Sequence, residues 1–89
     1  MSIVTVRHKV KDFDGWKKAF DAHKPMRDKA GLKLLTLERG IDVPNEVQIT
    51  MEAADIGKAR EFAASEDLKT TMVKAGVLGP PEVFIGNTV

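Results

Sequence analysis

Apolar and polar residues alternate in four short segments of the chain, a pattern typical of β-strands that are buried on one face. The predicted strands are residues 3–10, 33–39, 46–52 and 82–86. The first is rich in β-branched residues, and its even-numbered positions share one face: Val4, Val6, His8 and Val10. Residues 40–45 have the composition of a turn, so the second and third strands should form an antiparallel hairpin. The Gly-Pro-Pro run at 79–81 predicts a rigid, extended linker before the last strand.

Spacings of three and four residues predict helices in the two long segments between strands. In the first segment Asp12 can cap a helix whose inward stripe is Phe13, Trp16, Phe20, His23 and Arg27. Pro25 lacks a backbone N–H, so this helix should kink or split near residues 21–24, and Gly31 should end it. In the second segment Asp55 and Ser65 are predicted caps of two short helices, with inward residues Ile56, Ala59, Phe62, Ala63, Leu68, Met72 and Ala75.

The order of these segments, βαββαβ, predicts the fold class. Two right-handed crossovers place the helical segments on one face of a four-stranded antiparallel sheet, with strand order 4-1-3-2. This α+β, ferredoxin-like arrangement takes up residues 1–89 as a single domain. The predicted core on the helix side consists of Val4, Val6, Val10, Leu35, Leu37, Val47, Ile49, Met51, Val83 and Ile85.

The opposite face of the predicted sheet is a mixture of apolar, neutral and charged positions. Its members are Ile3, Thr5, Arg7, Leu34, Thr36, Glu38, Gln48, Thr50, Glu52 and Phe84. A solvated face would usually carry more lysine and glutamate, and a chain of this size buries only about 60–65% of its unfolded surface. We therefore expect a second copy to cover this face. A monomer with a solvated face is the alternative.

Several stretches of the chain resemble a known group of proteins. They are residues 12–23 (Asp-Phe-Asp-Gly-Trp-Lys-Lys-Ala-Phe-Asp-Ala-His), the turn at 42–47, residues 65–68 and residues 75–77. Together they resemble small dimeric α+β-barrel proteins, nearest to uncharacterised members close to the antibiotic biosynthesis monooxygenase (ABM) superfamily. The resemblance covers essentially the whole chain and concerns fold and dimerisation more than chemistry.

The resemblance implies a homodimer in which two sheets pack face to face, with a hydrophobic cavity between each sheet and its own helices. In characterised relatives that cavity binds polycyclic phenols, haem or other small hydrophobic compounds. The implied function is a cofactor-independent oxygenase acting on a small aromatic compound. Such oxygenases use Trp, Tyr, Asn and Arg around the substrate, whereas this chain has no tyrosine and one tryptophan, Trp16. A non-catalytic module for small molecules and a structural or regulatory dimer are the alternatives.

The two histidines are the candidate catalytic residues. His8 faces the core near the end of the first strand and is a candidate general base, because histidine titrates near neutral pH. The alternative for His8 is a hydrogen bond to backbone or solvent at the sheet end. His23 shares a helix stripe with Trp16, and it either lines the pocket or only packs. The predicted ligand-binding residues are Trp16, Phe20, Arg27, Met51, Phe62 and Met72.

Two arginines complete the set of candidate site residues. Arg27 and Arg39 are expected at the opposite end of the sheet from His8, because the second strand is taken to run antiparallel to the first. Either can bind a carboxylate through its planar fork. The alternative is that each reaches solvent or pairs with Glu or Asp.

Composition narrows the functions further. The chain has no cysteine and two histidines, so we expect no metal site and no cofactor. Its first strand lacks the asparagine, and its second helical segment the histidine, of haem-degrading relatives. A formal charge of +1 is too small to favour a nucleic-acid partner or an anionic membrane. No signal peptide or membrane span is recognisable, and a cytoplasmic location is the expectation.

Overall fold

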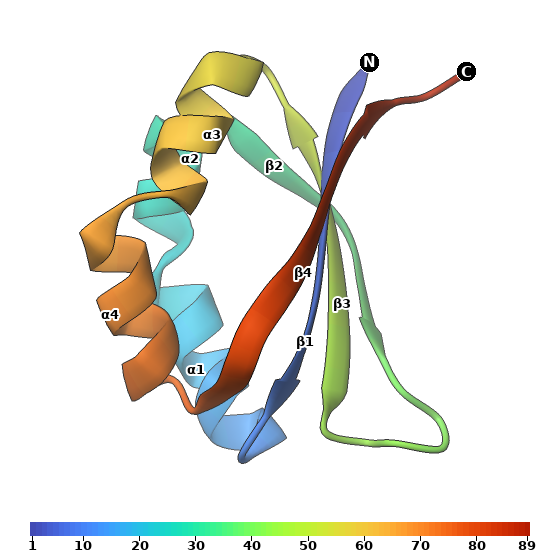
Figure 1. The fold of residues 1–89 in the computed structure, drawn as a ribbon, viewed down its shortest axis with the longest axis vertical. Helices are drawn as coiled ribbons and strands as arrows, with labels where there is room; N and C mark the ends of the chain where they lie inside the picture. The colour runs from blue at the N-terminus through green and yellow to red at the C-terminus, as the bar shows by residue number, and fades with distance from the viewer.

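The computed structural model describes residues 1–89 as one antiparallel sheet with all helices on one of its faces (Figure 1). The sheet order is β2-β3-β1-β4, which confirms the predicted 4-1-3-2 arrangement. In chain order the elements are β1 (Ser2–Val10), α1 (Phe13–Ala22), α2 (Lys24–Lys29), β2 (Leu32–Arg39), β3 (Glu46–Ala53), α3 (Ile56–Ala63), α4 (Glu66–Lys74) and β4 (Val77–Asn87).

Each predicted helix cap is present and fixes where its helix begins. The Asp12 carboxylate accepts a hydrogen bond from the Gly15 N–H at 3.0 Å, which starts α1. Asp55 accepts from the Lys58 N–H at 3.2 Å, which starts α3. Ser65 accepts from the Leu68 N–H at 3.2 Å at the start of α4. These bonds satisfy backbone donors that have no partner within the helix.

The predicted break in the first helical segment falls at His23, between α1 and α2. Pro25 is the second residue of α2, where its missing N–H does not interrupt the helical hydrogen bonds. The chain then turns at Gly31, whose φ of 73° is readily adopted only without a Cβ. The split lets α1 and α2 follow the sheet surface from one end to the other (Figure 1).

A bulge in β2 overturns the predicted faces of Leu34 and Leu35. Leu34 pairs with Met51, but Thr36 pairs with Thr50, so Leu35 has no partner on β3. Residues directly opposite each other in an antiparallel pair share a face. Leu34 therefore lies on the helix side with Met51 and not on the outer face, and Leu35 is exposed instead of contributing to the core.

The last strand is longer than predicted and contains a second irregularity. It begins at Val77, which pairs with Val10, and not at residue 82. The predicted Gly-Pro-Pro linker lies inside this strand, and its pairing to β1 is interrupted between Leu78 and Glu82. Proline has no N–H to donate to a neighbouring strand, which accounts for the interruption. His8 of β1 lies opposite this unpaired stretch.

The core lies between the helices and the inner face of β1 and β3. Its buried apolar members are Val4, Val10, Trp16, Ala30, Leu32, Val47, Ile49, Met51, Ala53 and Ala59. Val83 was predicted to be in this core but is 47% exposed, because β4 is an edge strand. Val83 nevertheless lies on the predicted helix side, opposite Val6, so the residues assigned to the wrong face are Leu34 and Leu35 in β2.

Candidate functional site

A cavity of about 120 Å³ lies between the helices and the inner face of the sheet. Fifteen of its 20 lining residues are hydrophobic. The structure brings eight of the nine candidate site residues together around it, all except Arg39: His8, Trp16, Phe20, His23, Arg27, Met51, Phe62 and Met72. Their roles in binding or catalysis stay predictions. The cavity contains only four polar or charged side chains, those of His8, His23, Arg27 and Thr71.

Thr71 is the one polar lining residue that sequence reasoning missed. It lies on α4 and is half-buried. A signal for it was present, because Thr71 follows the inward residue Leu68 by three positions and precedes the inward Ala75 by four. Its hydroxyl adds a small donor and acceptor to an otherwise apolar wall.

Three rings form a continuous row along one wall of the cavity, which we call the aromatic row: His8, Trp16 and Phe20. The His8 and Trp16 centroids are 5.5 Å apart in a T-shaped arrangement. Trp16 and Phe20 stack with their centroids 5.0 Å apart. The four-residue spacing on α1 produces this stack, since side chains four apart lie one above the other on a helix.

His8 is buried in the inner face of the sheet, with 7% of its surface exposed. It pairs with Val47 in β3, so its ring points to the helix side. Neither Nδ1 nor Nε2 has a hydrogen-bond partner within the chain, so the backbone bond that was the alternative for His8 is not formed. Burial lowers the pKa of His8 from its ordinary value, so the ring is neutral at pH 7. A neutral imidazole has one donor and one acceptor nitrogen, and both are free.

His23 occupies the junction between α1 and α2, further along the same wall. Its ring stacks on Phe62 of α3 with the centroids 5.7 Å apart. Partial burial and the neighbouring charge of Arg27 lower the pKa of His23, against a smaller raising effect of Asp67. His23 is therefore neutral at pH 7, and it is only half-buried.

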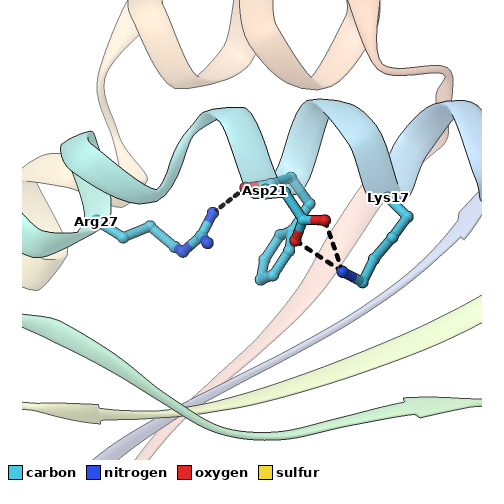
Figure 2. A network of polar contacts seen from close by, with 4 residues as sticks. Lys17, Asp21 and Arg27 are labelled. Atoms are coloured by element: carbon cyan, nitrogen blue, oxygen red, sulfur yellow. Dashed lines mark hydrogen bonds and ion pairs between the residues drawn. The ribbon is translucent and has the colours of Figure 1, made fainter.

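Arg27 lies beyond the other end of the aromatic row, with its guanidinium carbon 3.7 Å from the centre of the Phe20 ring. Its Nη1 donates a hydrogen bond to the Phe20 carbonyl oxygen. Figure 2 shows the side chain extended along the sheet side of the helices, whereas Asp21 turns toward Lys17. Burial lowers the pKa of Arg27, but an arginine remains charged at neutral pH.

The predicted location of Arg39 was wrong. β1 and β2 are both antiparallel to β3, so they run parallel to each other and end at the same edge of the sheet. Val47 pairs with both His8 and Arg39, which places the two at one end. Arg39 lies over the Phe13 ring at 4.3 Å, donates to the Pro44 carbonyl and does not line the cavity.

The structure contains no group of three or more His, Cys, Asp or Glu residues placed to hold a metal ion. None of its helices combines the length and apolar character needed to cross a bilayer.

No protein-family model and no curated protein matches the chain. Solved structures do match it over almost its full length. A Bordetella bronchiseptica protein provisionally named an antibiotic biosynthesis monooxygenase superposes with a TM-score of 0.77 at 18% identity, covering 99% of this chain and 97% of that one. A variant of SnoaB, a cofactor-independent oxygenase from Streptomyces nogalater, gives 0.73 at 15% identity, covering 98% and 91%.

The same architecture also occurs outside proteins named as monooxygenases. An uncharacterised NIPSNAP domain protein from Burkholderia xenovorans gives a TM-score of 0.67 at 10% identity, covering 100% of this chain and 95% of that one. At these identities the likeness shows the fold alone. The chain thus has the ABM-like, ferredoxin-like α+β fold that its residues resemble.

Proposed function

We propose that the cavity binds a small hydroxylated aromatic compound and that the chain is a cofactor-independent oxygenase acting on it. One observation carries the proposal: His8 lines a mostly apolar cavity, and both of its ring nitrogens are buried without a hydrogen-bond partner in the chain, so a small rotation of the ring would bring one of them to a ligand. Buried polar groups are normally hydrogen-bonded, and an exception calls for an explanation. A ligand hydroxyl at His8 supplies one, while the aromatic row and Met51 provide an apolar wall for the ring.

The size of the cavity favours a single ring. An engineered cavity of about 150 Å³ is large enough for benzene. The cavity here is somewhat smaller, about 120 Å³, and it is partly open, so at most one ring fits inside with its substituents toward the opening, and a polycyclic phenol is too large. The proposed ligand is therefore smaller than those that the family resemblance implies.

The neutral His8 ring has the protonation state that the proposed chemistry needs. Its unprotonated nitrogen accepts the phenolic proton, and the resulting phenolate is electron-rich enough to reduce molecular oxygen. Overall, the ring loses two hydrogens and gains one oxygen atom to become a quinone, and the second oxygen atom of O2 leaves as water. The substrate provides all the electrons, so the balance requires no added reductant. The fold likeness to SnoaB is consistent with this reaction class.

Oxygen uptake tests the oxygenase proposal. Wild-type protein mixed with phenol should consume one O2 per quinone formed, and His8→Leu should abolish the reaction. Arg39→Met is the matched control, because Arg39 packs on an aromatic ring outside the cavity and its loss should leave the reaction unchanged. Equal rates in wild type and His8→Leu would overturn the assignment of His8.

A non-catalytic binding module is the second candidate, and the lining of the cavity favours it. No tyrosine or asparagine is present there, and His8 is the one buried polar side chain without a partner. A reaction that develops negative charge on bound oxygen normally needs positioned donors. Saturable binding of phenol with no oxygen uptake would establish this second function in place of the first.

We also propose that the chain forms a homodimer through the outer face of the sheet. No helix covers this face (Figure 1), and Phe84 on it is 64% exposed. A shallow depression beside Phe84 is lined by Thr5, Arg7, Gln48, Glu82 and Val83. The opposite charges of Arg7 and Glu82, which lie across from each other on β1 and β4, balance, and an exposed aromatic beside them suits burial against a second copy. Light scattering at micromolar concentration should give twice the chain mass, and a monomer mass would contradict the proposal.

A further inference from the structure

Arg27 is the only ionised side chain among the buried residues, and it has no ion-pair partner. Its single hydrogen bond goes to the Phe20 carbonyl, although a guanidinium has five N–H donors. Taking a charge out of water is costly unless the charge is paired and hydrogen-bonded. Arg27 thus brings a positive charge to the cavity wall without a direct ion-pair partner in the chain, and most of its donors are not used within the chain.

The carboxylates nearest to Arg27 along the helices are already bound to other cations. Asp21 accepts from Lys17, with both oxygens 2.7 Å from Nζ, and Asp28 lies 2.9 Å from Lys24 Nζ. Both pairs are on the exposed side of the helices. His23, which is close to Arg27, is neutral at pH 7 and contributes no negative charge. Asp21 and Asp28 still favour the charge of Arg27 from a distance and act to raise its pKa, but neither forms an ion pair with it. The position of a direct ion-pair partner on the cavity side is thus open to a bound molecule.

We infer that Arg27 binds a carboxylate of the ligand and that the site takes a hydroxyaromatic carboxylate. This inference rests on the proposed aromatic ligand and specifies its class. The aromatic row separates the two polar groups: His8 is at one end, and the guanidinium lies over Phe20 at the other. A ring lying along the row has its hydroxyl toward His8 and its carboxylate toward Arg27.

The geometry of arginine favours a carboxylate over other polar groups. The planar guanidinium donates two parallel hydrogen bonds to the two oxygens of a carboxylate. Its plane is held by the Phe20 ring and the Phe20 carbonyl, so little side-chain freedom remains to be lost on binding. A neutral ligand of the same shape leaves the buried charge unpaired. The site should therefore discriminate between a carboxylate and its neutral analogue.

Fluorescence of Trp16 provides a direct assay, because Trp16 is the only tryptophan and lines the cavity. The probes are para-hydroxybenzoate, para-hydroxyphenylacetate and para-hydroxyphenylpropanoate, in which the carboxylate moves away from the ring one methylene at a time. Each is compared with its primary amide, which keeps the size but not the charge. Wild-type protein should bind the best acid at least about tenfold more tightly than its amide.

Arg27→Met should abolish this preference, so that the acid and its amide bind about equally well. Its affinity for the amide should stay within about twofold of the wild-type value. Arg39→Met is the matched control: Arg39 also lies over an aromatic ring and donates to a backbone carbonyl, but outside the cavity. It should keep the wild-type preference. The comparison of acid with amide in wild-type protein tests the inference even if Arg27→Met does not fold.

The outcomes separate this inference from the proposed function. If acids and amides quench Trp16 equally well in the wild-type protein, the carboxylate inference is overturned and the aromatic ligand stands. If phenol and all the probes leave Trp16 fluorescence unchanged, the aromatic ligand itself is refuted, and the carboxylate inference with it. Loss of the preference for the acid in both Arg27→Met and Arg39→Met would also overturn the assignment. The preference would then depend on the overall positive charge of the protein and not on Arg27.

Discussion

Replacing His8 by leucine removes two buried nitrogens that have no hydrogen-bond partner. Leaving a polar group buried and unsatisfied costs about 1–3 kcal/mol, so an apolar side chain of similar size should relieve that cost. The T-shaped contact with Trp16, with centroids 5.5 Å apart, is lost at the same time. An aromatic pair contributes about 0.5–1.5 kcal/mol. From the middle of the two ranges, the expected net effect is a gain in folding stability of about 1 kcal/mol.

Thermal denaturation at fixed protein concentration measures this gain. For a domain of this size, about 1 kcal/mol corresponds to about 4–8 °C in Tm. His8→Leu should therefore melt several degrees above the wild type while losing the response to phenol. This combination is expected where a binding residue is maintained at the expense of stability. His23→Leu is the control: it removes a half-buried ring stacked on Phe62 and should not raise Tm.

A fall in Tm for His8→Leu would refute the reasoning. It would mean that the nitrogens of the His8 imidazole have hydrogen-bond partners in the folded protein. The observation that carries the proposed function would then be lost, and so would the role of His8 in binding a hydroxyl group.

Three further predictions follow from the fold and the site. Burial lowers the pKa of His8, so below about pH 6.5 the unfolded chain binds a proton at this residue more readily than the folded chain does. The unfolding free energy should therefore decrease as the pH is lowered. Chemical denaturation between pH 7 and 5 should show a smaller decrease for His8→Leu than for wild type. Asp12→Ala removes the bond to the Gly15 N–H that starts α1, and it should lower the unfolding free energy by about 0.5–2 kcal/mol; no change would mean that packing of Trp16 alone fixes the helix start. Phe84→Lys should convert the proposed dimer into a monomer by light scattering, whereas Val73→Lys, on exposed α4, should not.

Much of the fold could be predicted because the residues that begin or break helices stand where the structure has helix ends. Asp12, Asp55 and Ser65 each start a helix where their side chains can cap it, and Pro25 divides α1 from α2. The bulge at Leu35 could not be predicted in this way. Two consecutive leucines satisfy either register, so alternation does not reveal which one loses its partner on β3.

The candidate site was predictable on the helices and less so on the sheet. The spacing of Trp16, Phe20 and Arg27 on one stripe places them on the cavity wall, where the structure has them. The unpartnered state of the His8 ring could not be read from its own segment, because it depends on which polar groups the fold brings around the ring. The position of Arg39 depends on the direction of β2. Because β1 and β2 both pair antiparallel with β3, they run parallel to each other, and Arg39 lies at the same end of the sheet as His8.

A crystal structure of the protein with bound phenol tests the central claim most directly. We expect a single ring inside the cavity, packed against Trp16 and Met51, with its hydroxyl oxygen about 2.7–3.2 Å from a nitrogen of His8. Phenol found only on the outer face of the sheet, or in the cavity with its hydroxyl turned away from His8, would contradict it.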